Sequence, residues 1–287
     1  MEQTLICPVC GFEPAEFFTQ KNNFTIYQCA NCGLGFVWPL PGDLEQLYDQ
    51  EYFKKNVADG FGYIDYYLDK EAMKDTFSRA LEEIGKLIAG RRLFDVGAAT
   101  GYFLDLARER GWQTAGAEIS EYAASIARSK GHKIFLGPLI ASEIKEAVDT
   151  VTMWDVLEHL DKPGTYLKKI NQLLSRGGLL VINTINKGSW WSKLMGSRWH
   201  ALIPPEHLYY YSVKSLAWLM TQHGFEILTV KRIGKKFSLP YIFKTLGNWQ
   251  KIGVWFRLAG YFDRPFWRSL AVPINLRDNI FLIARKK

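Results

Sequence analysis

Strand-like and helix-like patterns of hydrophobic residues alternate along most of the chain beyond residue 90. An apolar run at 92–97 precedes helical spacing at 102–110, and this exchange of patterns recurs as far as residue 232. Further strands are expected at 112–118, 132–136, 149–155, 179–185 and 225–232, and helices at 120–130, 164–175 and 213–223. A final run at 279–284 has no helix after it and is expected as an edge strand or a hairpin partner. Strands that alternate with helices predict an α/β fold with a doubly wound, mostly parallel, seven-stranded Rossmann-like sheet.

The chain before residue 91 is expected to form two smaller parts. Residues 1–42 end in the segment Trp38-Pro39-Leu40-Pro41-Gly42, which breaks regular structure. Residues 43–90 predict a helical linker or cap, with a clear apolar helical period over 77–88. The predicted organisation is a small module at 1–42, a linker at 43–90 and an α/β domain at 91–287.

All four cysteines lie in the first 32 residues, as Cys7-Pro-Val-Cys10 and Cys29-Ala-Asn-Cys32. Two Cys-x-x-Cys pairs with 18 residues between them have the spacing of a zinc ribbon, in which each pair turns two thiolates toward one metal ion. Two disulfides and a redox pair are the alternatives. We expect a cytoplasmic protein, and this location disfavours disulfides. A redox site needs only one Cys-x-x-Cys pair, so the second pair argues against that alternative. We therefore expect structural Zn²⁺, because four thiolate ligands leave no open position for a substrate.

The turn after the first apolar run carries the pattern Asp95-x-Gly97-x-x-x-Gly101. It lacks the middle glycine of the dinucleotide fingerprint, where Ala99 stands, and has no glycine at 102 or 103. The turn still brings backbone close to a ligand at the carboxyl end of a strand. Glu118 ends the next strand, where a carboxylate can accept hydrogen bonds from both hydroxyls of a ribose. The alternative is that Asp95 and Glu118 only cap the helices that follow them. Together, turn and carboxylate favour nucleoside binding.

Three segments resemble a known family: Phe94-Asp-Val-Gly-Ala-Ala-Thr-Gly101 followed by Glu118, then 149–160, then 167–183. They are similar to motifs of the class I S-adenosylmethionine (SAM)-dependent methyltransferases, above all the branch of ubiquinone-biosynthesis O-methyltransferases and glycan- or antibiotic-tailoring enzymes. The cysteine module resembles one in sugar C-methyltransferases, which carry a long C-terminal domain that we do not expect here. Ala99 stands where the family usually has the middle glycine of the turn.

The resemblance implies a SAM site at the ends of three strands. The residues assigned to the cofactor are Asp95, Gly97, Ala98, Gly101, Glu118, Trp154 and Asp155. The glycines would approach the methionine part and Asp95 would support the turn. Glu118 would hold the ribose, and Trp154 with Asp155 would border the sulfonium and the amino end.

Methyl transfer to a hydroxyl needs a base as well as alignment, and three residues are our catalytic candidates: Glu158, His159 and His207. Asp155, Glu158 and His159 share one face if a helical turn begins there. They could form a wall of the cofactor pocket, orient a base, or bind Mg²⁺ or another divalent ion. His207 lies in the loop 199–211, together with Glu206 and His200, where substrate binds in this fold. Local hydrogen bonding in a packed loop is the alternative for His207.

Basic and aromatic residues gather near the C-terminus. The chain carries a net charge of +7, but residues 231–287 alone hold 13 Lys and Arg against 2 Asp and Glu. An insert at about 235–276 stands where this fold needs only a short turn. Its aromatic and basic stretch, 237–272, suits a membrane interface or a lipid-linked acceptor, a lid or oligomer contact, or a nucleic acid, the last being the least favoured.

The leading hypothesis is a SAM-dependent methyltransferase that methylates oxygen on a small-molecule, glycan or lipid-linked acceptor. The alternatives are C- or N-methylation of a nucleotide-activated sugar, and an RNA methyltransferase or nucleic-acid-binding protein. The chain has no apolar run of 18 residues, and its first residues lack the pattern of a secretory signal. We therefore expect a cytoplasmic protein, with peripheral contact at the inner face of the membrane as an option.

Overall fold

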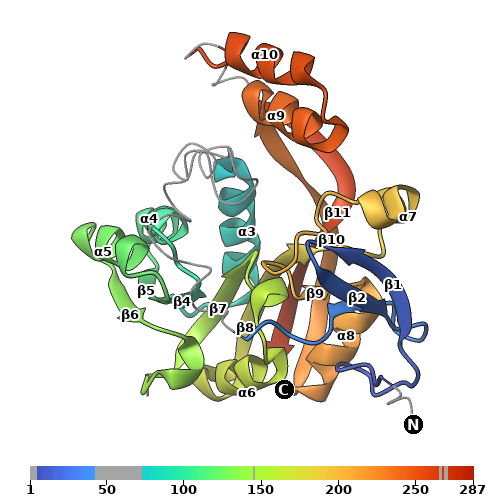
Figure 1. Ribbon diagram of the computed structural model, residues 1–287. Helices are drawn as coiled ribbons and strands as arrows, with labels where there is room; N and C mark the ends of the chain where they lie inside the picture. Colours follow the sequence, from blue (N-terminus) through green and yellow to red (C-terminus); the bar gives the residue numbers. More distant parts are fainter. Residues whose placement is uncertain (1–4, 43–72, 145, 265–266, 268–270) are drawn as a thin grey trace.

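The computed structural model describes residues 5–42, 73–144, 146–264, 267 and 271–287. Among them, seven strands form one sheet in the order β10-β11-β8-β7-β4-β5-β6 (Figure 1). The strands from β8 to β6 run parallel, whereas β11 lies antiparallel to both β8 and β10. The strand bounds are β4 Arg92–Val96, β5 Gln113–Glu118, β6 Lys133–Leu136, β7 Val148–Trp154, β8 Leu174–Ile185, β10 Phe225–Ser238 and β11 Ala271–Lys286.

Helices cover both faces of this sheet, which is why its central strands read as continuous apolar runs. In β8, Leu179 and Val181 pack toward α3 Lys74–Leu87, α4 Tyr102–Glu109 and α5 Glu121–Ser129. Leu180 and Ile182 pack on the opposite side, toward α6 Pro163–Leu173 and α8 Val213–Gln222. Each face therefore has its own apolar layer.

The predicted α/β class and seven-stranded, mostly parallel sheet are confirmed. Helix α3 coincides with the apolar period expected at 77–88, and the rest of the predicted linker, 43–72, lies outside the described residues. The last strand, β11, is a hairpin partner of β10 and not an edge strand, because it lies between β10 and β8. Strand β8 begins at Leu174, five residues earlier than expected.

A second, four-stranded sheet joins the N-terminal residues to the rest of the chain. Its order is β1 Glu16–Lys21, β2 Phe24–Gln28, β3 Gly35–Val37 and β9 Tyr209–Tyr210, all antiparallel neighbours. Leu34 and Phe36 belong to the same apolar core as Leu208 and residues of α8. The cysteine-bearing segment thus shares a sheet and a core with residues that follow it by roughly 170 positions.

Strands β10 and β11 continue well beyond the sheet and carry two helices at their far end. These are α9 Leu239–Gln250 and α10 Gly253–Tyr261, which Figure 1 shows standing clear of the main body. The remaining short elements are α7 Trp190–Met195 and 3₁₀ turns at Leu139–Ala141, Leu157–His159 and Gly196–Arg198. In the described ranges, every helix is too short or too polar to cross a bilayer.

Candidate functional site

Backbone conformation at the glycine turn explains why small residues are needed there. Gly97 and Gly101 have φ angles of +74° and +80°, in the left-handed region that glycine adopts without a steric penalty. A Cβ on Gly97 would lie 2.6 Å from Cγ2 of Val156, so the turn also passes close to the end of β7. Ala99 has a φ of +47° and accepts some strain where the family's glycine would have none.

Two buried carboxylates hold this turn in place. Asp95 accepts a hydrogen bond of 2.6 Å from Oγ1 of Thr152, which ties β4 to β7. Glu118 accepts hydrogen bonds from the backbone N–H groups of Ala99, at 2.8 Å, and Ser120, at 2.9 Å. Burial raises the pKa of Glu118, and the backbone N–H groups that point at its carboxylate oppose that rise.

The pair of turn and carboxylate fits a nucleoside ligand. Strands β4 and β5 are parallel neighbours, so the turn and Glu118 meet at the same carboxyl edge of the sheet. A carboxylate offers about four lone-pair positions, and the backbone N–H groups around Glu118 do not fill all of them. Glu118 can therefore orient the turn and still accept a hydrogen bond from a ribose. These residues fit SAM, whose adenosine needs such an acceptor.

Trp154 and Asp155, the candidates at the end of β7, have different surroundings. The Trp154 ring is buried, with its centroid 4.7 Å from that of Phe77 and 5.1 Å from that of Phe103. Its Nε1 atom has no hydrogen-bond partner among the described residues. Asp155 has a φ of +55° and accepts a 2.6 Å hydrogen bond from Nδ2 of Asn183 in β8. Both residues lie at the same carboxyl edge of the sheet as the glycine turn, and their contact with SAM stays a prediction.

The three catalytic candidates come together beside this edge. Glu158 and His159 lie in the 3₁₀ turn after β7, and the ring of His207 lies 4.7 Å from the ring of His159 between centroids. Each of the three offers a ligating atom within 4.8 Å of the other two. Asp155 is not part of this cluster.

Hydrogen bonds fix the orientation of both imidazoles. Nδ1 of His159 lies 2.8 Å from the carbonyl oxygen of Glu206, and Nδ1 of His207 lies 2.8 Å from that of Ala201. A carbonyl only accepts, so each Nδ1 carries the proton and each neutral ring has its acceptor at Nε2. Glu158 is fully buried and accepts a 2.8 Å hydrogen bond from Oγ1 of Thr184.

The other candidates in the loop 199–211 lie differently. His200 is half exposed and its Nε2 lies 3.4 Å from a carboxylate oxygen of Asp278. Glu206 is buried, and burial raises the pKa of its side chain to about 7. Neither side chain belongs to the cluster of Glu158, His159 and His207.

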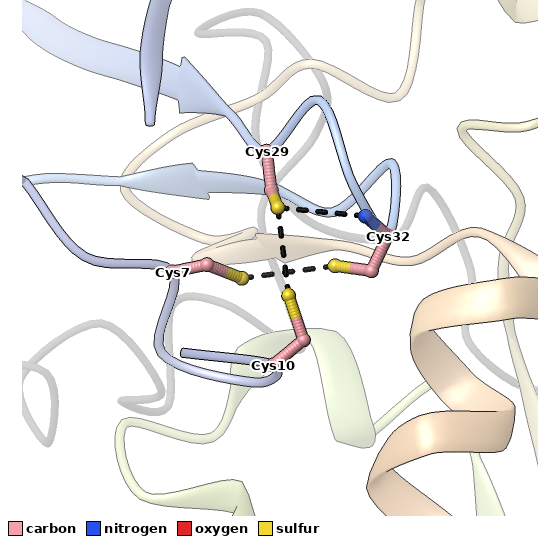
Figure 2. A group of neighbouring side chains, drawn as sticks. All are labelled: Cys7, Cys10, Cys29 and Cys32. Atoms are coloured by element: carbon pink, nitrogen blue, oxygen red, sulfur yellow. Dashed lines mark hydrogen bonds between the residues drawn. The ribbon is translucent and has the colours of Figure 1, made fainter. Parts of the chain in front are cut away.

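The four cysteines converge on one point, as Figure 2 shows. The sulfur of Cys7 lies 3.7 Å from that of Cys32, and the sulfur of Cys10 lies 3.6 Å from that of Cys29. A tetrahedral zinc site with Zn–S bonds of about 2.3 Å has sulfurs about 3.8 Å apart, whereas a disulfide joins them at about 2.05 Å. The hydrogen bond between the side chains of Cys7 and Cys32 lowers the pKa of Cys7 and raises that of Cys32, so Cys7 is the thiolate of the pair. The residues therefore fit Zn²⁺.

Sequence reasoning missed the partners that hold these side chains. Thr152, Asn183 and Thr184 bind Asp95, Asp155 and Glu158 respectively. The available signal was the polar pair Asn183-Thr184 inside the buried run of β8, where a polar residue needs a hydrogen-bond partner.

Comparison with known proteins gives a consistent family. A family model described as a methyltransferase domain matches residues 65–230. The ubiquinone biosynthesis O-methyltransferase of Stutzerimonas stutzeri is 29% identical over 108 residues, which are 35% of this chain and 47% of that protein. The Chromobacterium violaceum enzyme of the same name is 26% identical over 136 residues, 40% of this chain and 58% of that protein. The chain thus spans about half the length of the curated relatives it matches.

Solved structures share the fold at low identity. A SAM-dependent methyltransferase from Thermotoga maritima superposes with a TM-score of 0.52 at 20% identity, covering 77% of this chain and 94% of that one. Magnesium protoporphyrin IX methyltransferase from Synechocystis, with S-adenosylhomocysteine bound, gives 0.51 at 15% identity and covers 80% and 91%. Because the family model spans more than half of its residues, the chain belongs to the class I SAM-dependent methyltransferases.

Proposed function

We propose that this chain transfers a methyl group from SAM to a hydroxyl of a small-molecule acceptor. The named relatives that methylate oxygen support the choice of atom. The observation that carries the proposal is the pair of imidazoles, His159 and His207, whose Nδ1 atoms are both held by backbone carbonyls. An imidazole fixed in this way presents Nε2 as a proton acceptor beside the cofactor edge of the sheet.

The proposed SAM site consists of residues at the ends of β4, β5 and β7. Glu118 would hold the ribose hydroxyls, the turn from Gly97 to Gly101 would lie against the methionine part, and Asp155 would face the amino end. Bound SAM supplies the electrophilic methyl group on its sulfonium. The protein's share of the work is to align the acceptor behind that methyl and to exclude water.

On the acceptor side, His159 would take the hydroxyl proton at Nε2 as the new O–C bond forms. The bond from Nδ1 to the carbonyl of Glu206 stabilises the imidazolium that results, because that proton stays hydrogen-bonded. His207 and buried Glu158 flank this ring and would restrict its movement.

A bound metal ion is the competing role for the same cluster. One carboxylate and two imidazoles form a donor set that suits zinc, iron or manganese better than Mg²⁺, which prefers oxygen ligands. A metal role requires activity to vanish on chelation that leaves the zinc of the cysteine site in place, and to return with the ion, whereas a base requires neither.

The experiment begins with calorimetric titration of the zinc-loaded protein with SAM and S-adenosylhomocysteine. Radiolabelled methyl transfer to hydroxyl-bearing aromatic, sugar and lipid-linked acceptors follows. His159→Asn keeps a donor near the position of Nδ1 and removes the acceptor at Nε2, so turnover should fall by about 10²–10⁴ with unchanged SAM affinity. His223→Gln is the control, since that ring is held by Leu219 in α8. Absence of SAM binding in folded protein, or full activity of the His159 variant, would overturn the proposal.

We also propose that the tip of the β10–β11 extension contacts an anionic membrane surface. Four large side chains there, Ile252, Val254, Phe256 and Tyr261, are 46–58% exposed, and the surrounding sequence is strongly basic. Apolar side chains that enter the interface and cations that remain in the headgroup region together give peripheral binding. A lipid-linked acceptor would then reach the enzyme from this surface.

Vesicle flotation tests the contact. Wild type should float with vesicles that contain phosphatidylglycerol and much less with pure phosphatidylcholine. Phe256→Ser should weaken flotation several-fold, while Phe17→Ser, an equally drastic change at a 66% exposed side chain in β1, should not. Equal recovery of all three proteins would remove the membrane assignment, and salt-sensitive RNA binding lost in Phe256→Ser would favour a nucleic acid instead.

A further inference from the structure

A cleft of about 440 Å³ lies between the cysteine module and the segment that follows β8. One wall consists of Phe18, Gln28 and the knuckle at 30–33, and the other of residues 187–196 with the start of α8. It is separate from the SAM edge, which is built by the ends of β4, β5 and β7. Its size falls within the range of small-ligand pockets, about 300–1,000 Å³.

Lys187 is the central cation of this cleft. Lys187 is only 8% exposed. Its Nζ lies 3.9 Å from the centre of the Phe18 ring and donates a hydrogen bond to Oε1 of Gln28. Its aliphatic chain crosses Gly35, where an added Cβ would lie 2.8 Å from Cδ of Lys187. Burial lowers the pKa of Lys187 to about 8. The described residues give it no carboxylate partner, so its charge is offset only by an amide and an aromatic ring.

Two more cations line the cleft and no acidic side chain does. Lys193 from α7 and Lys214 from α8 are exposed at its rim, and Lys214 donates to the carbonyl of Asn31. The N-terminus of α8 opens into the cleft at Ser212 and adds a partial positive charge. A buried cation with no counter-ion is costly, and a multiply charged anion in the cleft would remove that cost.

The simplest alternative is that these lysines balance the negative charge of the zinc site. Four thiolates around Zn²⁺ carry a net charge of about −2, and Cys32 lies in the wall of the cleft. Yet Lys187 points along the small sheet, and neither its hydrogen bond to Gln28 nor its contact with the Phe18 ring involves a sulfur. Three lysines also exceed the charge of the metal site, which leaves a positive cleft.

The cleft lies close to the proposed acceptor site along the chain. Thr184, which holds Glu158, precedes Lys187 by three residues, a span of at most about 11 Å of extended backbone. An acceptor anchored by a charged group at Lys187 could therefore extend its hydroxyl toward His159.

We propose that this lysine cleft binds the diphosphate group of a phosphorylated acceptor. This inference rests on the proposed methyl transfer for its purpose, but not for its test. Ammonium groups on flexible chains bind diphosphates as point charges, and three lysines from different segments can each contact a phosphate oxygen. A sugar diphosphate carried by a nucleotide and one carried by a lipid have this chemistry in common.

Calorimetry with inorganic pyrophosphate, on the full-length zinc-loaded protein without SAM, is the direct test. Wild type should bind pyrophosphate with a dissociation constant below about 1 mM, and Lys187→Met, which keeps the aliphatic packing, should weaken binding at least tenfold. Lys133→Gln is the matched control, because it removes one exposed lysine charge from β6 at the opposite edge of the large sheet. No binding by wild type, or an equal loss in Lys133→Gln, would overturn the site.

Two further measurements separate the alternatives. Zinc content by mass spectrometry should be unchanged in Lys187→Met, and a loss of metal there would assign the lysine to the zinc site and overturn the proposal. Uridine diphosphate and farnesyl diphosphate, titrated in parallel, distinguish a nucleotide-linked from a lipid-linked acceptor by which binds more tightly than pyrophosphate. SAM affinity, measured on the same samples, reports separately on the proposed methyl transfer.

Discussion

Gly101 and Gly111 offer a matched test of what shapes the cofactor turn. Both have a φ of +80°, so alanine at either position must adopt the same unfavourable backbone conformation. An added Cβ at Gly111 meets nothing within 4 Å, whereas at Gly101 it would lie 2.9 Å from Cδ2 of His132 and 3.2 Å from Cβ of Ala127. The difference between the two variants therefore isolates crowding from strain.

The size of the effect follows from what His132 would lose. Its side chain is fully buried, and its ring nitrogens lie 2.8 Å from Oδ1 of Asp105 and 3.2 Å from Oγ1 of Thr114. Left-handed strain costs about 1 kcal/mol at both glycines. Displacing the ring would weaken two hydrogen bonds of about 1 kcal/mol each, so Gly101→Ala should lose about 3 kcal/mol and Gly111→Ala about 1 kcal/mol.

Urea unfolding of the zinc-loaded proteins, followed by circular dichroism, measures both free energies. Calorimetric titration with SAM should show weaker binding for Gly101→Ala and unchanged binding for Gly111→Ala, since only the turn at Gly101 belongs to the proposed SAM site. Equal destabilisation of the two variants would refute the crowding argument. Normal SAM affinity in a folded Gly101→Ala would refute the placement of the turn against the ligand.

Three other predictions address single side chains. The N–H groups of Ala99 and Ser120 now bind both carboxylate oxygens of Glu118, and Glu118→Gln leaves only one oxygen that can accept. Calorimetry should therefore show a SAM affinity at least tenfold lower for this variant. An unchanged affinity would contradict the assignment of Glu118 to the ribose. Burial raises the pKa of Glu206 to about 7 from 4.5, so its contribution to stability is complete below pH 4.5 and is lost as the pH rises through 7. Glu206→Gln should thus exceed wild type in unfolding free energy by about 3 kcal/mol at pH 8 and match it at pH 4.5, and a pH-independent difference would argue against this origin. Cys29→Ser should lose zinc by mass spectrometry and lower the melting temperature, whereas a metal-free native wild type would exclude the zinc site.

Local patterns in the sequence were enough for the large sheet and the glycine turn. The continuous apolar run of β8 and the helical period of α3 each depend on neighbours within a few residues, which a sequence displays directly. The cysteine spacing predicted the cluster of four thiols for the same reason, because each Cys-x-x-Cys pair forms a local turn.

These local patterns do not predict contacts between segments that are distant in the sequence. Nothing in Tyr209 and Tyr210 marks them as a strand until β3 is placed beside them. Trp154 fits a ligand wall and a core equally well by composition, and only Phe77 and Phe103, from two helices, decide that it packs in an aromatic cluster. Lys187 looks like an ordinary loop lysine until the cysteine module covers it.

The pairing of β3 with β9 also has a consequence for how the chain assembles during synthesis. Leu208 accepts a hydrogen bond from the N–H of Val37 and donates its own N–H to the carbonyl of Glu158. Strand β3 must therefore wait for a partner that is synthesised roughly 170 residues later. Such long-range contacts slow folding. Because the same short segment that pairs with β3 also hydrogen-bonds to Glu158, docking of the cysteine module and the final position of this turn depend on one late contact.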